Sequence, residues 1–80
     1  MIIKITDVQK KYLELNVLNN DKDLLKLFKE SGNIINIDDD IADEIRDLCC
    51  KKLDYYGFDN NYNKTIQGEI LEELIDVFYQ

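Results

Sequence analysis

Hydrophobic positions recur at helical spacing over most of the chain. The first such face carries Val8, Tyr12 and Leu15, at intervals of four and three residues. Thr6 and Gln9 stand ahead of it as the pair of a capping box, which satisfies the first free amides of a helix. We therefore expect a helix over about residues 6–18. Residues 13–17 also alternate with strand period, so a partly extended segment stays open there, and residues 1–5 are expected to form a short extended arm.

A second, shorter helix is predicted after Asn19, Asn20 and Asp21, which are turn and N-cap residues. Leu24, Leu27 and Phe28 define one face, and the helix should end before Gly32. The next segment carries Ile34, Ile35 and Ile37. We expect it to be a linker that packs onto the core.

The third helix has the longest apolar stripe. One of Asp38, Asp39 and Asp40 should cap it, because carboxylates suit the positive end of a helix dipole. The stripe then consists of Ile41, Ile45, Leu48, Cys49, Leu53 and Tyr56. Gly57 follows, and Phe58 is placed to close a Schellman-type cap.

A polar turn over residues 59–64 leads to a fourth helix that Thr65 can cap. Its apolar face consists of Ile66, Ile70, Leu74, Val77 and Phe78. Four amphipathic helices with short connections predict an all-α fold, a compact four-helix antiparallel bundle. Residues 1–80 should form one domain, since nothing in the sequence marks a linker or a repeat.

Charge narrows the classes of partner. The 80 residues carry ten Lys and Arg against seventeen Asp and Glu, a net charge of −7. Residues 41–80 hold nine of these acids and only four bases. Such a field repels nucleic acid and anionic lipid and attracts basic proteins. We expect no direct contact with nucleic acid or with a membrane.

Missing residue types argue against catalysis. The chain has no His, which removes the usual general base and imidazole metal ligand. Cys49 and Cys50 are adjacent, so a disulfide between them is disfavoured and free thiols fit the cytoplasm. The opening MIIKIT is too short for a signal-peptide apolar region, and no apolar run could span a membrane. We expect a cytoplasmic protein with no catalytic residues and no cofactor.

The best candidate site is an acidic face on the third and fourth helices. Its carboxylates lie opposite the apolar stripes and are mixed with few lysines. The predicted partner-binding residues are Asp38, Asp39, Asp40, Asp43, Asp47, Asp54, Tyr55, Glu72, Glu73 and Asp76. Tyr55 is included as an interface anchor, and we expect one of Tyr55 and Tyr56 to be buried and the other exposed. For Asp38 to Asp40, the alternative is a helix cap with two solvated neighbours.

Residues 59–66 follow the pattern of a calcium-binding EF-hand loop only in part. Oxygen ligands fall at the right positions, but Lys64 stands where glycine is needed and Ile70 where a bidentate Glu is needed. We expect no metal site here. The two cysteines also lack the spacing of a zinc or redox motif.

The second half resembles known antidote proteins. The likeness is carried by Glu44-Ile45-Arg46-Asp47-Leu48-Cys49, by Tyr56-Gly57-Phe58-Asp59, and by Asn61-Tyr62 leading through Gly68 to Ile70-Leu71-Glu72-Glu73-Leu74-Ile75-Asp76. This pattern is similar to the C-terminal half of small bacterial immunity proteins, the antidotes of contact-dependent growth inhibition and of colicin-type nuclease toxins. The resemblance implies a cytoplasmic, non-catalytic helical protein that binds a toxin domain and neutralises it.

Three hypotheses follow from these observations. The favoured one is an immunity protein in a one-to-one complex with a basic nuclease toxin, expected to be an RNase, because nuclease surfaces hold phosphates. The second is a phage-borne inhibitor that imitates DNA with its carboxylates and blocks a host nuclease or defence complex. The third is a helical scaffold whose isoleucine-rich segments form a homodimer.

Overall fold

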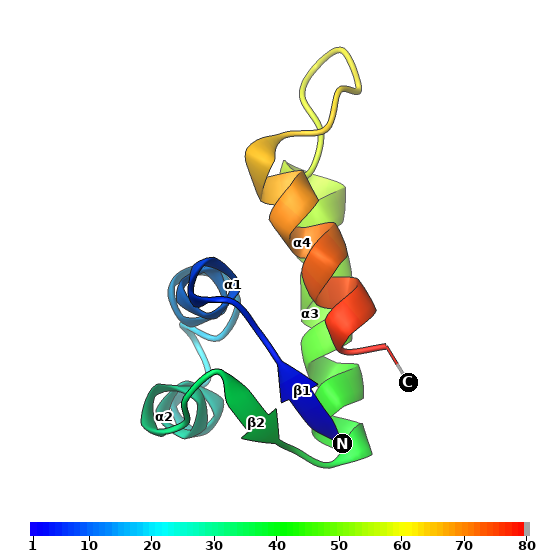
Figure 1. Ribbon diagram of the computed structural model, residues 1–80. Coiled ribbons are helices and arrows are strands. Elements are labelled where there is room, and N and C mark those ends of the chain that lie inside the picture. Colours follow the sequence, from blue (N-terminus) through cyan, green and yellow to red (C-terminus); the bar gives the residue numbers. More distant parts are fainter. Residues whose placement is uncertain (80) are drawn as a thin grey trace.

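The computed structural model describes residues 1–79, and Figure 1 shows how they are arranged. Its elements are β1 (Ile2–Lys4), α1 (Asp7–Tyr12), η1 (Leu13–Val17), α2 (Lys22–Glu30), β2 (Ile34–Asn36), α3 (Asp39–Tyr56) and α4 (Ile66–Val77). The element η1 is a turn of π-helix that continues α1, closed by a hydrogen bond of 2.8 Å from the Leu18 amide to the Leu13 carbonyl.

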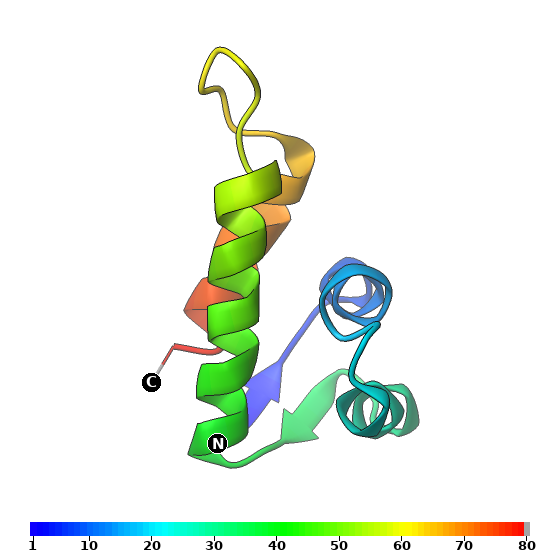
Figure 2. The ribbon, with the colours of Figure 1, turned by 180° about the vertical axis from the view of Figure 1, so that it is seen from behind.

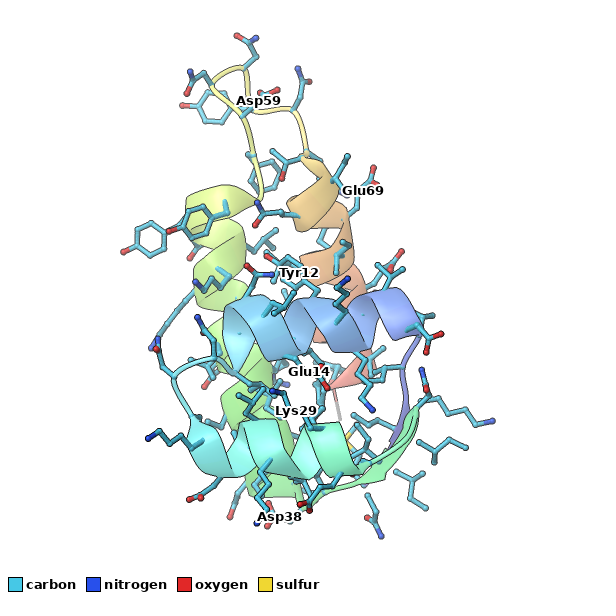
Figure 3. The ribbon with its side chains drawn as sticks, turned by 90° about the vertical axis from the view of Figure 1, so that its left-hand side faces the viewer. Tyr12, Glu14, Lys29, Asp38, Asp59 and Glu69 are labelled. Atoms are coloured by element: carbon cyan, nitrogen blue, oxygen red, sulfur yellow. The ribbon has the colours of Figure 1, made fainter. Side chains whose placement is uncertain are left out.

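The predicted all-α four-helix antiparallel bundle is wrong. The chain contains a two-stranded antiparallel sheet, β1 with β2. Moreover, α1 and α2 are seen end-on in Figure 1 while α3 and α4 are seen along their length, so the first two helices cross the α3–α4 hairpin. Figure 3 shows the same arrangement from the side, with α1 and α2 stacked across α3.

The small sheet brings the N-terminus and residues 33–37 together. Ile3 pairs with Ile35, and the backbones of Met1 and Ile37 exchange two hydrogen bonds of 2.7 and 2.9 Å. Side chains alternate across the strands, so Ile3, Ile5, Ile35 and Ile37 are buried. Ile34 points outward and is 60% exposed. The N-terminal arm expected over residues 1–5 and the linker expected over residues 33–37 therefore pair with each other as two strands of one sheet.

The first helix begins as predicted but buries another face. The Thr6 side chain accepts from the Gln9 amide and the Gln9 side chain accepts from the Thr6 amide, which completes the capping box. Val8 and Leu15 are exposed, contrary to prediction. The buried face consists of Gln9, Tyr12, Leu13, Val17 and Leu18. Because the i→i+5 bond widens the turn, residues four and five apart lie above each other, which places Leu13, Val17 and Leu18 on one side.

The second helix follows the sequence prediction closely. The Asp21 side chain accepts from the Leu24 amide at 3.1 Å. Leu24 and Phe28 are buried as predicted, whereas Leu27, predicted on the same face, is 36% exposed. The Phe28 ring lies 6.4 Å from that of Phe78, so this contact joins α2 to the end of α4.

The α3–α4 hairpin is closed by a backbone contact. An added Cβ at Gly68 would lie 2.2 Å from the Gly57 carbonyl oxygen. The backbones at the end of α3 and the start of α4 are therefore so close that only glycine fits at position 68. Thr65 caps α4 through the Gly68 amide, and its own hydroxyl donates to the Tyr56 carbonyl at 2.8 Å. The predicted Schellman-type cap is wrong, because Gly57 is right-handed and Phe58 instead forms a bridge with Lys64.

The apolar faces of the hairpin are also shifted slightly from the prediction. On α3 the buried side chains are Ala42, Ile45 and Cys49, while Tyr56 is 53% exposed. On α4, Leu71 and Leu74 are fully buried, whereas the predicted core residue Ile66 is 79% exposed. These side chains, with Phe28 and Phe78, form one core between the hairpin and the crossing helices.

Candidate acidic interface on α3

An acidic stripe follows the outer face of α3. It consists of Asp40, Asp43, Asp47 and Asp54, which are all exposed and follow one another at three, four and seven residues. This spacing places them on one face of the helix, away from Ala42, Ile45 and Cys49. The stripe is about 21 Å long at 1.5 Å per residue. In Figure 2 α3 lies in front of the other elements.

Asp38 and Asp39 lie at the start of the stripe and are already engaged. The Asp38 carboxylate accepts from the Ile41 amide at 2.8 Å, and it is therefore the residue that caps α3. Asp39 and Asp40 occupy the first turn, where the helix dipole favours negative charge. Farther along the stripe, Asp43 lies 3.5 Å from the guanidinium of Arg46, the chain's one arginine.

Two of the three predicted α4 carboxylates make contacts within the chain. Glu72 forms an ion pair with Lys64 in the turn, and this hydrogen bond raises the pKa of Lys64. Glu73 accepts from the Gln9 side chain at 3.1 Å, so it points toward α1. Asp76 is exposed. The structure thus gathers the α3 carboxylates and commits two of the α4 carboxylates to contacts within the chain.

Tyr55 lies near the end of the stripe, and 81% of it is exposed. Its ring is 6.3 Å from that of Tyr56, and the Lys52 ammonium lies 5.2 Å from the centre of the Tyr56 ring. Both tyrosines are exposed, so the expected division into one buried and one exposed ring is wrong. Tyr55 stays available as an anchor for a partner.

The opposite side of the molecule carries mixed charge. A groove of about 410 Å³ between α1 and α2 is lined by Lys10, Lys11 and Lys29 together with Asp7 and Glu14. Figure 3 shows Glu14 and Lys29 on neighbouring helices, facing the same space. The Lys10 ammonium donates to the Ser31 carbonyl. The carboxylates of Asp7 and Glu14 offset much of the positive charge of the lysines in this groove. The groove therefore lacks the strong single-sign charge of the stripe on α3.

The two cysteines lie in different environments on α3. Cys50 is exposed and lies between Asp47 and Asp54 along the stripe, while Cys49 is fully buried. Burial raises the pKa of Cys49 to about 12, with a smaller contribution from Cys50. Cys49 is therefore a neutral core residue at physiological pH.

The polar turn over residues 59–64, which resembles a calcium loop in part, is stabilised by the side chain of Asp59. The Asp59 carboxylate accepts from the amides of Asn61 and Asn63 at 2.8 and 3.0 Å. Within residues 1–79, no three His, Cys, Asp or Glu side chains are grouped so as to hold a metal ion. No helix in the same range combines the length and apolar character needed to cross a membrane.

Two adjoining pockets were not anticipated from the sequence. They lie where η1 meets α3, and Tyr12, Asn16 and Lys52 are among the residues that line them. Burial raises the pKa of Tyr12, with smaller contributions from Cys49 and Tyr56, so its hydroxyl stays protonated. The lining residues come from separate segments, and no local motif could have marked them.

No protein-family model, curated protein or solved structure matches this chain.

Proposed function

We propose that this chain is an inhibitor that binds a basic nuclease toxin domain, one to one, through the acidic stripe on α3. The observation that carries the proposal is the stripe itself: four exposed carboxylates on one helix face of a chain whose net charge is −7. It supports a partner with a cationic groove, because complementary charge speeds encounter and fixes the orientation of docking.

The kind of partner follows from the chemistry of nucleases. An enzyme that holds a phosphate backbone presents Lys and Arg, and carboxylates can occupy the same positions as phosphates. The exposed ring of Tyr55 adds an anchor at the end of the stripe. Bacterial immunity proteins, which the second half resembles, act on toxins of this kind.

The test uses a charge-reversed stripe and a matched control. Asp43→Lys with Asp47→Lys changes the net charge by +4, and so does Asp23→Lys with Glu30→Lys on α2, where both residues are exposed. The partner is the product of the neighbouring gene, co-purified with the chain and then titrated at two salt concentrations. We expect the stripe variant to bind at least about tenfold more weakly and with a reduced salt dependence.

The control variant should retain most of the affinity, and only it should rescue growth when the toxin is expressed inside the cell. Equal affinity losses in both variants would show that net charge alone attracts the partner. Unchanged binding by the stripe variant would place the interface elsewhere. Thermal unfolding of both variants checks that each is folded.

A further inference from the structure

Two pockets adjoin where η1 packs against α3. The first is polar, has a volume of about 210 Å³ and is lined by Tyr12, Asn16, Lys52, Tyr56 and Gln67. The second is mainly apolar, has a volume of about 250 Å³ and is lined by Val17, Leu48, Lys51, Lys52, Tyr55 and Tyr56. Lys52 and Tyr56 line both, so they separate two halves of one concave region. No residue of the acidic stripe lines either pocket.

The polar pocket is rich in hydrogen-bond donors. The Tyr12 hydroxyl donates to the Gln67 carbonyl oxygen at 3.0 Å, which leaves the N–H groups of that amide for another acceptor. Asn16 uses one N–H in a bond of 3.4 Å to the Tyr12 carbonyl and keeps the other. Lys52 contacts the Tyr56 ring, and neither Lys51 nor Lys52 forms an ion pair within residues 1–79.

Charge distinguishes these two pockets from the α1–α2 groove. Asp and Glu outnumber Lys and Arg by seventeen to ten, yet the lining of the two pockets includes two lysines and no carboxylate. The α1–α2 groove differs, because its lysines are accompanied by Asp7 and Glu14. The field in the adjoining pockets therefore favours an anion, and the apolar half favours an apolar group attached to it.

The size and charge of the pockets select the form of the ligand. Each pocket is smaller than the roughly 300–1,000 Å³ typical of small-molecule sites and has room for about one side chain. One or two ammonium groups with neutral donors suit a singly charged carboxylate better than a phosphate. The π-helical turn contributes by placing Asn16 and Val17 beside α3, and such turns recur at functional sites.

We propose that the two pockets form one binding site for a peptide segment of a protein partner in which a carboxylate side chain lies next to a large apolar one. The carboxylate binds Lys52 and the amide donors of Asn16 and Gln67. The apolar side chain fills the pocket between Val17, Leu48 and Tyr55. This site shares no carboxylate with the acidic stripe. Tyr55, the proposed anchor for the toxin, also lines its apolar half, so the two partners would contact the same ring. Binding of the peptide segment does not require the toxin.

The probe is the blocked peptide acetyl-Gly-Leu-Glu-Leu-Gly-amide, in which leucine flanks the carboxylate on both sides. Its match is the peptide with Gln in place of Glu. Both are titrated into the isotopically labelled full chain, and amide chemical shifts are followed by NMR. We expect shifts concentrated at residues 12–17, 48–56 and 67, and a dissociation constant at least about fivefold lower for the Glu peptide.

Two variants locate the charge. Lys52→Met should weaken the Glu peptide to the level of the Gln peptide, whereas Lys22→Met, an exposed lysine on α2, should leave both peptides unchanged. Leu48→Ala should weaken both peptides alike. Equal binding of the two peptides to the unmodified chain would overturn the proposal, as would shifts spread over other surfaces or no binding at millimolar peptide. An equal loss in Lys52→Met and Lys22→Met would also overturn it.

Discussion

The α3–α4 hairpin and the N-terminal region are stabilised by different kinds of contact. In the hairpin, both helix starts and the turn depend on neighbouring residues: Asp38 and Thr65 cap the helices, and Gly57 contacts Gly68 across the turn. In the N-terminal region, β1 gains its hydrogen bonds only from β2, which follows two helices later. The hairpin can thus form from local signals, whereas the N-terminal region depends on pairing between segments that lie 30 or more residues apart in the sequence.

The largest effect is expected where the two regions meet. Phe28→Ala removes a fully buried ring that contacts Phe78, and it should lower the free energy of unfolding by about 3–5 kcal/mol. In a domain of this size that loss is close to the whole stability. Chemical denaturation followed by circular dichroism measures it.

Phe28→Leu is the matched control, because it keeps most of the apolar volume and should cost clearly less. A small loss for Phe28→Ala would mean that the hairpin and the N-terminal region fold without each other. The contact between the two rings would then be peripheral.

The next effect tests the turn of the hairpin. Gly68→Ala places a methyl group against the Gly57 backbone, which must move, so we expect a loss of about 2–3 kcal/mol. Gly32→Ala is the control in the N-terminal region, since an added Cβ there meets nothing within 4 Å and the backbone is not left-handed. That change should be neutral or stabilising by up to about 1 kcal/mol. Similar losses for both would contradict the close contact.

The smallest effect is a dependence on pH. The pKa of Cys49 is raised by burial from 9.0 to about 12, so the unfolded thiol ionises before the native one. The stability that the neutral thiol contributes is complete below pH 9 and is lost as the pH rises toward 12. Urea unfolding between pH 7 and 10.5 should show that the stability advantage over Cys49→Ala narrows above pH 9. Cys50→Ala should keep the slope of the unmodified chain, and a slope that persists in Cys49→Ala would assign it to other groups.

The sequence predicts the features that depend on neighbouring residues and misses those that depend on distant ones. The caps Thr6 and Thr65 are predicted correctly, because a cap involves residues three positions apart. For the other two helices the sequence predicts a group of three candidate residues, and the structure selects Asp21 and Asp38. The sheet was missed because Ile34 and Ile35 gave no sign of their partner near the N-terminus. The prediction for Leu15 is wrong because it assumes an α-helical period through a segment that widens into a π-helix. Val8 lies in α1 itself, where the buried residues are Gln9 and Tyr12.

The candidate sites also differ in whether their residues are close together or far apart in the sequence. The α3 stripe could be found from spacing alone, since every member belongs to one helix. The contacts of Glu72 with Lys64 and of Glu73 with Gln9 could not, because they depend on how the turn and α1 pack against α4. The pockets at Lys52 depend on three separate segments and required the structure.

The position of Cys50 offers a practical route to the interface. It is an exposed thiol in the middle of the carboxylate row, and its neighbour Cys49 is shielded in the core. A maleimide fluorophore would attach there in the folded chain without any engineered residue. Since the chain has no tryptophan, excitation of tryptophan in an added partner would report on that partner alone, while the dye would report on this face.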